Sequence, residues 1–193
     1  RPMTVAPTHA PLADSPPRLR RRLRVMVGLL ILLVLMGVNL AIASGKVRFE
    51  KVISGSMEPT LLIGDVLLMD ANAVPDQYDI VVLNDPEEPG GKLVKRIIGM
   101  PGDRIVLRGG ILYLNGKEEY STQVTSNHIS WEDTRFKVPE DHVFVLGDNR
   151  NNSVDSLNFG PVSYEEIRGV VSAVIWPPSR WRKPAPLHPE PAE

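Results

Sequence analysis

The stretch RIVLRGGILYLNG, residues 104–116, predicts a β-hairpin and points to the fold class. Two β-rich runs flank Gly109-Gly110, and a two-residue turn of this kind needs positive φ, which glycine tolerates. Similar short apolar runs bounded by turn residues occur at 65–69, 79–83, 142–148 and 169–176. Only SYEEI, 163–167, looks like a short helix, with Ser163 as its N-cap and a glutamate three residues later. We therefore expect a mostly β domain over residues 46–176.

The bulk composition excludes several classes of function. The 193 residues carry a formal net charge of −1, so the overall charge does not call for a nucleic acid partner. Cysteine is absent, which excludes cysteine nucleophiles, thiolate metal sites and disulfides. The sequence also lacks the G-x-S-x-G, H-E-x-x-H and Gly-rich phosphate-binding motifs.

The N-terminal part predicts a membrane anchor. RLRRRLR, 18–24, precedes the apolar run VMVGLLILLVLMGVNLAIA, 25–43, and about 20 apolar residues suffice to span a bilayer. A cleaved secretory signal ending at AIA is the alternative, but its apolar core is usually only about 7–15 residues long. A buried soluble helix is disfavoured because the run has no polar face. We favour a retained anchor over 25–45.

Charge then predicts the orientation of this anchor. Arginine-rich flanks stay in the cytoplasm, so residues 1–24 should be a cytoplasmic, disordered and basic segment, and residues from 46 onward should be extracytoplasmic. The last residues, 177–193, form a Pro-rich tail that we also expect to be disordered. AIA ends the run and places alanine at both the −3 and −1 positions of a cut before Ser44. A second copy of the chain could therefore clip the anchor there.

VISGSMEPTL, 52–61, predicts a strand that ends in a loop. Glycine is costly in a helix, and Pro59 moves Glu58 out of the α region. Ser54 and Ser56 then lie at the turn, where a protein can expose a nucleophile.

KLVKRIIGMPGD, 92–103, predicts a strand with one cation on each face. Lys95 lies between Leu93 and Ile97, and burial would lower the pKa of its amine and make it a competent general base. The alternative is a lysine that snorkels at a sheet edge, and Arg96 is open to the same interpretation. This stretch alone favours that alternative.

LGDNRNNSVDSLNFGP, 146–161, is polar and rich in turn residues. It is open to interpretation as an ordinary solvated loop, whereas a calcium loop fits poorly because Arg150 and Ser153 stand where acidic ligands are wanted. Among the histidines, His9 and His188 lie in the terminal segments. His128 and His142 could each serve as a triad base, but neither has a surrounding motif, so packing or surface roles are favoured.

The order of four stretches is more specific than any one of them. SGSMEPTL, GDVLLM, KRIIGMPGD and GDNRNNSVDS closely resemble the consecutive boxes of bacterial type I signal peptidases, the leader peptidase family of membrane-anchored serine proteases with a Ser-Lys dyad. The resemblance implies a β-rich catalytic core with a small β insertion, here about 103–136, preceded by one transmembrane helix. It also implies removal of signal peptides from exported pre-proteins after small residues of the A-x-A type at the cell membrane, by a monomer, without metal or cofactor.

The resemblance also assigns roles to individual residues. It makes Ser56 the nucleophile and Lys95 the general base, with the Ser54 hydroxyl and the Ser56 N–H as the oxyanion hole. The remaining assignments are Ser153 as the serine that orients the lysine amine, Met57 as a residue of the binding cleft, and Asp148 and Asp155 as acids that hold the site loop.

One departure from the family pattern concerns the second acid. The family usually has Asp-Ser-Arg where this chain has Asp155-Ser156-Leu157, and a buried acid without a cation is costly. Either Arg150 supplies the cation, or Asp155 is more exposed than in relatives.

Two further hypotheses stay open beside general signal peptidase activity. One is a specialist with the same dyad that matures a single partner protein. The other is a membrane-tethered binding module with an inactive site, which is disfavoured because Ser56 and Lys95 are both present.

Overall fold

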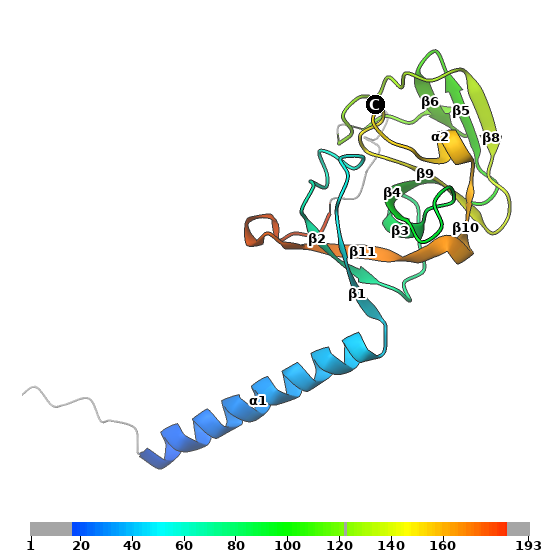
Figure 1. The fold of residues 1–193 in the computed structure, drawn as a ribbon. Coiled ribbons are helices and arrows are strands. Elements are labelled where there is room, and N and C mark those ends of the chain that lie inside the picture. Colours follow the sequence, from blue (N-terminus) through cyan, green and yellow to red (C-terminus); the bar gives the residue numbers. More distant parts are fainter. Residues whose placement is uncertain (1–16, 122, 185–193) are drawn as a thin grey trace, which may run out of the picture. The chain divides into compact units, whose positions relative to one another are not determined.

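An N-terminal helix and a β-rich domain that begins at Ser44 make up the computed structural model, which describes residues 17–121 and 123–184 (Figure 1). The helix α1, Pro17–Ala43, has 27 residues. At 1.5 Å per residue it is about 40 Å long, more than the hydrocarbon core of a bilayer. Its segment Arg21–Leu40 is long and apolar enough to cross a membrane. The side-chain amide of Asn39, a polar group within this segment, donates a hydrogen bond to the Leu35 carbonyl at 2.8 Å.

The start of α1 corrects one expectation. The basic residues 17–24 are helical rather than disordered, since arginine and leucine are good helix formers and continue the apolar helix toward its N-terminus. Residues 1–16 and 185–193 lie outside the described part of the chain.

The first sheet of the β domain has seven antiparallel strands in the order β1-β2-β11-β3-β4-β9-β10. Their bounds are Val47–Lys51 for β1, Val66–Asp70 for β2, Ile80–Asn84 for β3, Lys92–Gly99 for β4, His142–Leu146 for β9, Val162–Ser163 for β10 and Ile167–Trp176 for β11. The strand β4 lies inside the sheet, between β3 and β9.

The second sheet is built from the segment that we expected as an insertion. It has four antiparallel strands in the order β7-β6-β5-β8. Their bounds are Arg104–Arg108 for β5, Ile111–Leu114 for β6, Lys117–Glu118 for β7 and Thr134–Lys137 for β8. The predicted hairpin is confirmed, and Gly109 and Gly110 have φ of 57° and 77°.

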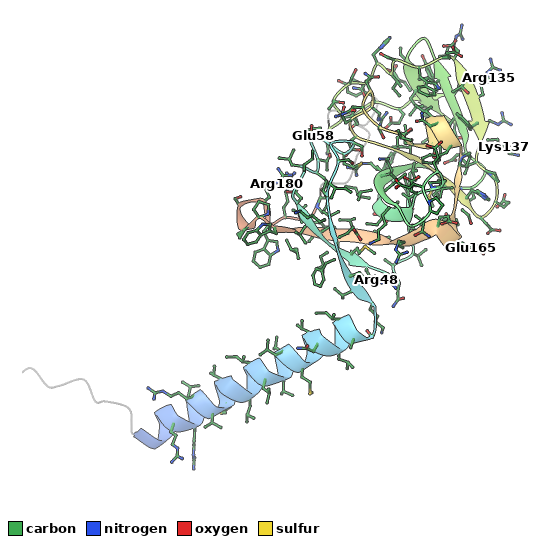
Figure 2. The ribbon with its side chains drawn as sticks, in the orientation of Figure 1. Arg48, Glu58, Arg135, Lys137, Glu165 and Arg180 are labelled. Atoms are coloured by element: carbon green, nitrogen blue, oxygen red, sulfur yellow. The ribbon has the colours of Figure 1, made fainter. Side chains whose placement is uncertain are left out.

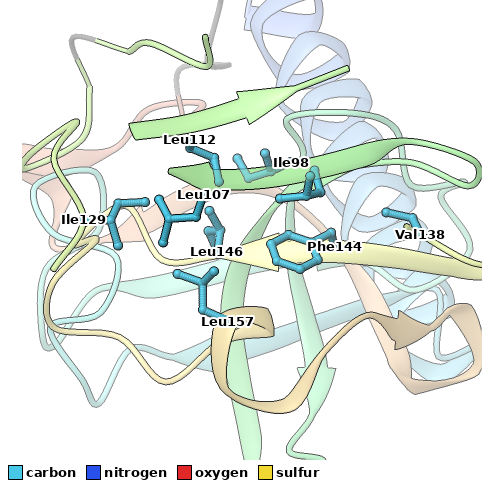
Figure 3. Packing of buried hydrophobic residues seen from close by; sticks show 9 residues of the cluster. Ile98, Leu107, Leu112, Ile129, Val138, Phe144, Leu146 and Leu157 are labelled. Atoms are coloured by element: carbon cyan, nitrogen blue, oxygen red, sulfur yellow. The ribbon is translucent and has the colours of Figure 1, made fainter. Parts of the chain in front are cut away.

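A shared core packs the two sheets together. Figure 3 shows Leu107 and Leu112 of the second sheet against Phe144 and Leu146 of the first, with Leu157 closing one side. Within β8, Phe136 packs on Phe144 with ring centroids 5.0 Å apart, while Arg135 and Lys137 point outward (Figure 2).

Three short helices complete the described fold: α2, Ser156–Phe159; the 3₁₀ turn η1, Tyr164–Glu166; and the 3₁₀ turn η2, Pro178–Arg180. The predicted short helix at 163–167 is therefore a single 3₁₀ turn, capped by the Ser163 hydroxyl, which accepts from the Glu165 N–H. The sequence did not predict α2.

The beginning of the C-terminal tail is folded, contrary to our expectation. Arg182 pairs with Val174 as a β-bridge, and the guanidinium of Arg180 binds the buried carboxylate of Asp65 at 2.9 Å. Both arginines also donate to the Thr60 carbonyl. Proline-rich composition predicted disorder, but these ionic and backbone contacts order residues 178–182.

Candidate active site

The loop after β1 carries two serines on a buried support. The Val52 N–H donates to the Asp65 carbonyl at 2.9 Å, and the Leu61 N–H donates to the Met57 carbonyl at 2.8 Å, so the loop is closed by its own backbone. Met57 and Leu61 are 1% and 0% exposed and belong to the core. The predicted change from strand to loop is therefore confirmed, and Ser56 stands on a fixed base.

A lysine amine from β4 reaches the hydroxyl of Ser56. Lys95 Nζ and Ser56 Oγ are 2.8 Å apart, and both residues are buried, with Lys95 only 2% exposed. Because Lys95 pairs with Val81 inside the sheet, the interpretation as a snorkelling lysine at a sheet edge is wrong.

Burial sets the proton affinity of this amine. Desolvation lowers the pKa of Lys95 below its ordinary value, because the charged ammonium loses its hydration. The negative charges of Asp155 and, to a lesser degree, Asp85 act in the opposite direction. The net effect is a lowered pKa, so the amine of Lys95 loses its proton at a lower pH than an exposed lysine does.

Two hollows meet at Ser56, and one of them also includes Lys95. One, of about 570 Å³, is lined by Ser54, Ser56, Lys95 and Ser153, together with Asp85, Leu93 and Val154 among others. The second, of about 510 Å³, is lined by Ser54, Ser56 and Met57, with Ile53 and Leu93 among others. Ser54 Oγ lies 3.3 Å from Ser56 Oγ. The structure thus brings together five of the predicted site residues.

Ser153 does not make the hydrogen bond that we expected. Its hydroxyl is buried against Gly147 and close enough to Asp155 to lower the pKa of that carboxyl, but it makes no hydrogen bond with Lys95. The amine of Lys95 instead contacts Ser56, so any orienting effect of Ser153 on that amine requires a rotation of its hydroxyl.

Asp148 holds the loop that follows β9. Its carboxylate forms two hydrogen bonds with Arg96, at 2.9 and 2.7 Å, and both side chains are 1% exposed. The Thr60 hydroxyl donates to the same carboxylate. Arg96 is therefore a buried structural partner of Asp148 and not a snorkelling surface cation.

Both expectations about Asp155 are wrong. This residue is 2% exposed, so it has not moved to solvent, and Arg150 instead binds the buried Glu119 at 3.0 Å. The carboxylate of Asp155 accepts from the N–H groups of Gly147 and Leu157 and caps α2. Burial raises the pKa of Asp155, while the Gly147 N–H, the Ser153 hydroxyl, the Leu157 N–H and the Lys95 charge oppose that rise.

The described histidines take no part in this site. His142 Nδ1 contacts the Glu140 carbonyl at 2.9 Å, and the ring of His128 packs over Gly110. Neither residue lines the hollows at Ser56. His9 and His188 lie outside the described residues. Within residues 17–121 and 123–184, no three His, Asp or Glu side chains are grouped to hold a metal ion.

A hydroxyl within hydrogen-bond distance of a buried lysine amine, in a cleft of a β-rich domain, defines a class of serine hydrolase that uses a lysine where others use histidine. The family model described as "Signal peptidase, peptidase S26" matches residues 22–176. The chain therefore belongs to the signal peptidase family, peptidase S26, as its sequence motifs predicted, and it has the mostly β fold expected for it.

Several characterised or named proteins are similar to this chain. The probable signal peptidase I-2 of Synechocystis sp. is 39% identical over 140 residues, which cover 66% of this chain and 62% of that protein. Signal peptidase I of Bacillus caldolyticus is 35% identical over 139 residues, 63% of this chain and 75% of that protein. Mitochondrial inner membrane protease subunit 2 of Danio rerio is 32% identical over 148 residues, 72% of this chain and 69% of that protein.

A solved structure is also similar. The crystal structure of a signal peptidase I from Enterococcus faecalis is 31% identical to this chain, covers 51% of it and 97% of the solved chain, and has a TM-score of 0.44.

Proposed function

We propose that this chain is a membrane-anchored serine endopeptidase that removes N-terminal signal peptides from exported pre-proteins. The observation that carries the proposal is the 2.8 Å contact between Ser56 Oγ and the buried amine of Lys95. Membership in the signal peptidase family supplies the reaction class, and the two hollows beside Ser56 supply room for an extended peptide.

The chemistry follows from this pair. The neutral Lys95 amine takes the proton of the Ser56 hydroxyl as its oxygen attacks the scissile carbonyl. The resulting oxyanion is stabilised by the Ser56 N–H and the Ser54 hydroxyl. The lysine then returns the proton to the leaving amine, and water, activated by the same amine, hydrolyses the acyl-enzyme. Met57 lines the cleft, while Asp148 and Asp155 hold the loops that frame it.

The proposed substrate comes from membership in the signal peptidase family, and the apolar helix supports the proposed location. Signal peptides with small residues at the −1 and −3 positions, of the A-x-A type, fit shallow subsites that reject larger side chains. The apolar helix α1 anchors the protein in the cell membrane, and the arginine-rich flank keeps the N-terminus cytoplasmic. Tethering holds a monomeric catalytic domain near membrane-bound substrates and raises their effective concentration.

The test is cleavage of a purified pre-protein in detergent by the full-length chain. Ser56→Ala and Lys95→Ala should each abolish cleavage while the circular dichroism spectrum stays unchanged. His128→Ala and His142→Ala are the controls and should retain activity, since neither side chain lines the hollows at Ser56. Normal turnover by the Ser56→Ala or Lys95→Ala variant would refute the mechanism, and loss of turnover in a folded histidine variant would favour a Ser-His pair.

A narrower substrate range is the second candidate. It is favoured by the similarity to subunit 2 of a mitochondrial inner membrane protease, a protein named as one part of an assembly. A panel of unrelated pre-proteins separates the two hypotheses. Cleavage of most of them supports general signal peptidase activity, and cleavage of a single one supports the specialist.

A further inference from the structure

Asn149 makes two contacts with the backbone of the serine loop. Its own N–H donates to the Ser56 carbonyl at 3.0 Å, and its side-chain Nδ2 donates to the Gly55 carbonyl at 3.0 Å. The Gly55 carbonyl also accepts from the Glu58 N–H, at a longer distance of 3.2 Å. The half-buried Asn149 thus contacts the peptide groups on both sides of the Ser56 α-carbon.

The amide of Asn149 is itself held in this orientation. The Thr125 hydroxyl lies 3.3 Å from Asn149 Oδ1 and 3.3 Å from the Asp148 carbonyl, and the Thr125 N–H donates to that carbonyl at 3.0 Å. The Gly55 carbonyl can only accept a hydrogen bond, so the Nδ2 end of the amide faces Gly55 and the oxygen end faces Thr125. Thr125 belongs to the segment between β7 and β8, so the second sheet supports this contact.

Peptide geometry turns the contact with Gly55 into a constraint on Ser56. The Gly55 carbonyl and the Ser56 N–H belong to one planar trans peptide, in which the two groups point in opposite directions. A donor that holds the carbonyl on one side therefore aims the N–H toward the other side. That N–H is the main-chain oxyanion donor in the function proposed above.

We infer that Asn149 is a positioning residue for the oxyanion hole, acting through the Gly55–Ser56 peptide. The inference rests on the proposed function, because an oxyanion forms only if Ser56 attacks a carbonyl. The contact between the Asn149 N–H and Ser56 uses the main chain and persists in every side-chain variant. Substitution of the side chain therefore removes the Nδ2 contact with Gly55 and, in Asn149→Leu, also the contact with Thr125, while the longer contact of the Glu58 N–H with the same carbonyl remains.

Two variants and a control separate the orientation of the Ser56 N–H from general stabilisation of the fold. Asn149→Leu has a similar volume and no donor, and Asn149→Asp keeps an oxygen for Thr125 but presents no donor to Gly55. The control is Asn127→Leu. The Asn127 amide also makes two hydrogen bonds with backbone, both to Ser121, and lies in the same segment as Thr125, but it does not contact the serine loop.

We expect a loss confined to the chemical step. Removal of one oxyanion donor typically lowers kcat about 10²–10³-fold, so misdirecting one should lower kcat about 10–100-fold. KM should stay within about twofold, since substrate binding does not use the oxyanion contact in the ground state. In Asn149→Leu the low-pH limb of kcat/KM should not move, because the burial of Lys95 is unchanged. Asn127→Leu should keep kcat even if its Tm falls.

Three results would overturn the inference. The first is a folded Asn149→Leu or Asn149→Asp variant whose kcat stays within about threefold of the parent, instead of falling by about 10–100-fold. The second is a loss in Asn149→Leu that comes with a shift of the low-pH limb to higher pH, which means that water has reached Lys95. The third is failure of both variants to fold, which makes the role structural. Cleavage by Ser56→Ala in the same assay would instead refute the proposed function itself.

Discussion

Replacing Gly147 by alanine would place a methyl group against the backbone of Ser56, the proposed nucleophile. Gly147 directly follows β9, and its N–H donates to the carboxylate of Asp155 at 3.0 Å. A Cβ built on this glycine lies 2.5 Å from the Ser56 carbonyl oxygen and 2.4 Å from Ser153 Oγ. The hydroxyl of Ser153 can rotate away, but its Cβ, at 2.6 Å, cannot, and the Ser56 carbonyl is main chain and is also held by the Asn149 N–H.

The size of the clash gives the size of the expected effect. Ordinary contact with a Cβ begins at 3.4 Å, so the Ser56 backbone and the loop after β9 must separate by close to one ångström. A misplacement of about 1 Å in reacting groups can lower the rate about 10²-fold. We therefore expect Gly147→Ala to lower kcat/KM about 100-fold, because the 2.8 Å contact between Ser56 and Lys95 cannot survive the shift unchanged.

The assay is steady-state cleavage of an A-x-A pre-protein in detergent, with Tm measured on the same samples. Gly99→Ala is the matched control, because a Cβ on that buried glycine meets only side chains, the nearest being Ile105 at 2.9 Å. It should lower Tm and leave kcat/KM within about threefold, since it forces no displacement of reacting groups. A folded Gly147→Ala enzyme with near-normal kcat/KM would show that the serine loop tolerates this displacement and refute the reasoning.

Three other predictions follow from the burial of Lys95 and the end of α1. Because burial lowers the pKa of Lys95, kcat/KM should rise with pH through a midpoint below the ordinary value of 10.5, and a midpoint at or above 10.5 would contradict burial. Lys95→Met should abolish cleavage but raise Tm at neutral pH, because the unfolded chain keeps a hydrated ammonium that folding must desolvate. This gain in Tm should shrink as pH rises toward 10.5, where the amine of the unfolded chain also loses its proton. A Tm of Lys95→Met below that of the parent at neutral pH would contradict the prediction. Finally, a second copy of the chain should clip the anchor between Ala43 and Ser44, where α1 ends; N-terminal sequencing of a shortened product, absent from the Ser56→Ala sample, tests this.

Local turn chemistry predicted the second sheet well, and long-range contacts explain what the sequence missed. Gly109-Gly110 identifies its hairpin without any tertiary information. In contrast, β1 has the sequence VRFEK, whose two apolar residues make an alternation too short to identify a strand, and it is a strand because it pairs with β2. The helix α2 has only four residues, too few for a helical period to be recognised. The tail folds because Arg180 meets Asp65, a residue 115 positions earlier.

In the site, too, sequence motifs predicted some features, and others depend on tertiary contacts. The order of motifs indicated that Ser56 and Lys95 belong together, and strand alternation indicated a desolvated lysine, but the sequence could not decide between a central strand and an edge. It also could not show that Glu119, from the segment after β7, takes the guanidinium of Arg150. Asn149 carries no motif of its own beyond its place after Asp148, and only the hydrogen bond with Gly55 distinguishes it from the other asparagines of the loop.

The way in which Asp155 is held decides whether Lys95 can act as a base. Asp155 is the strongest of the charges that raise the pKa of Lys95, and a direct ion pair would keep the amine protonated and unable to accept a proton. The structure avoids this by giving both carboxylate oxygens other donors, the N–H groups of Gly147 and Leu157. Leu157 stands where the family usually has an arginine. Here its N–H donates to Asp155 and its side chain packs in the apolar core. The amine contacts Ser56, the group whose proton it takes in the proposed mechanism.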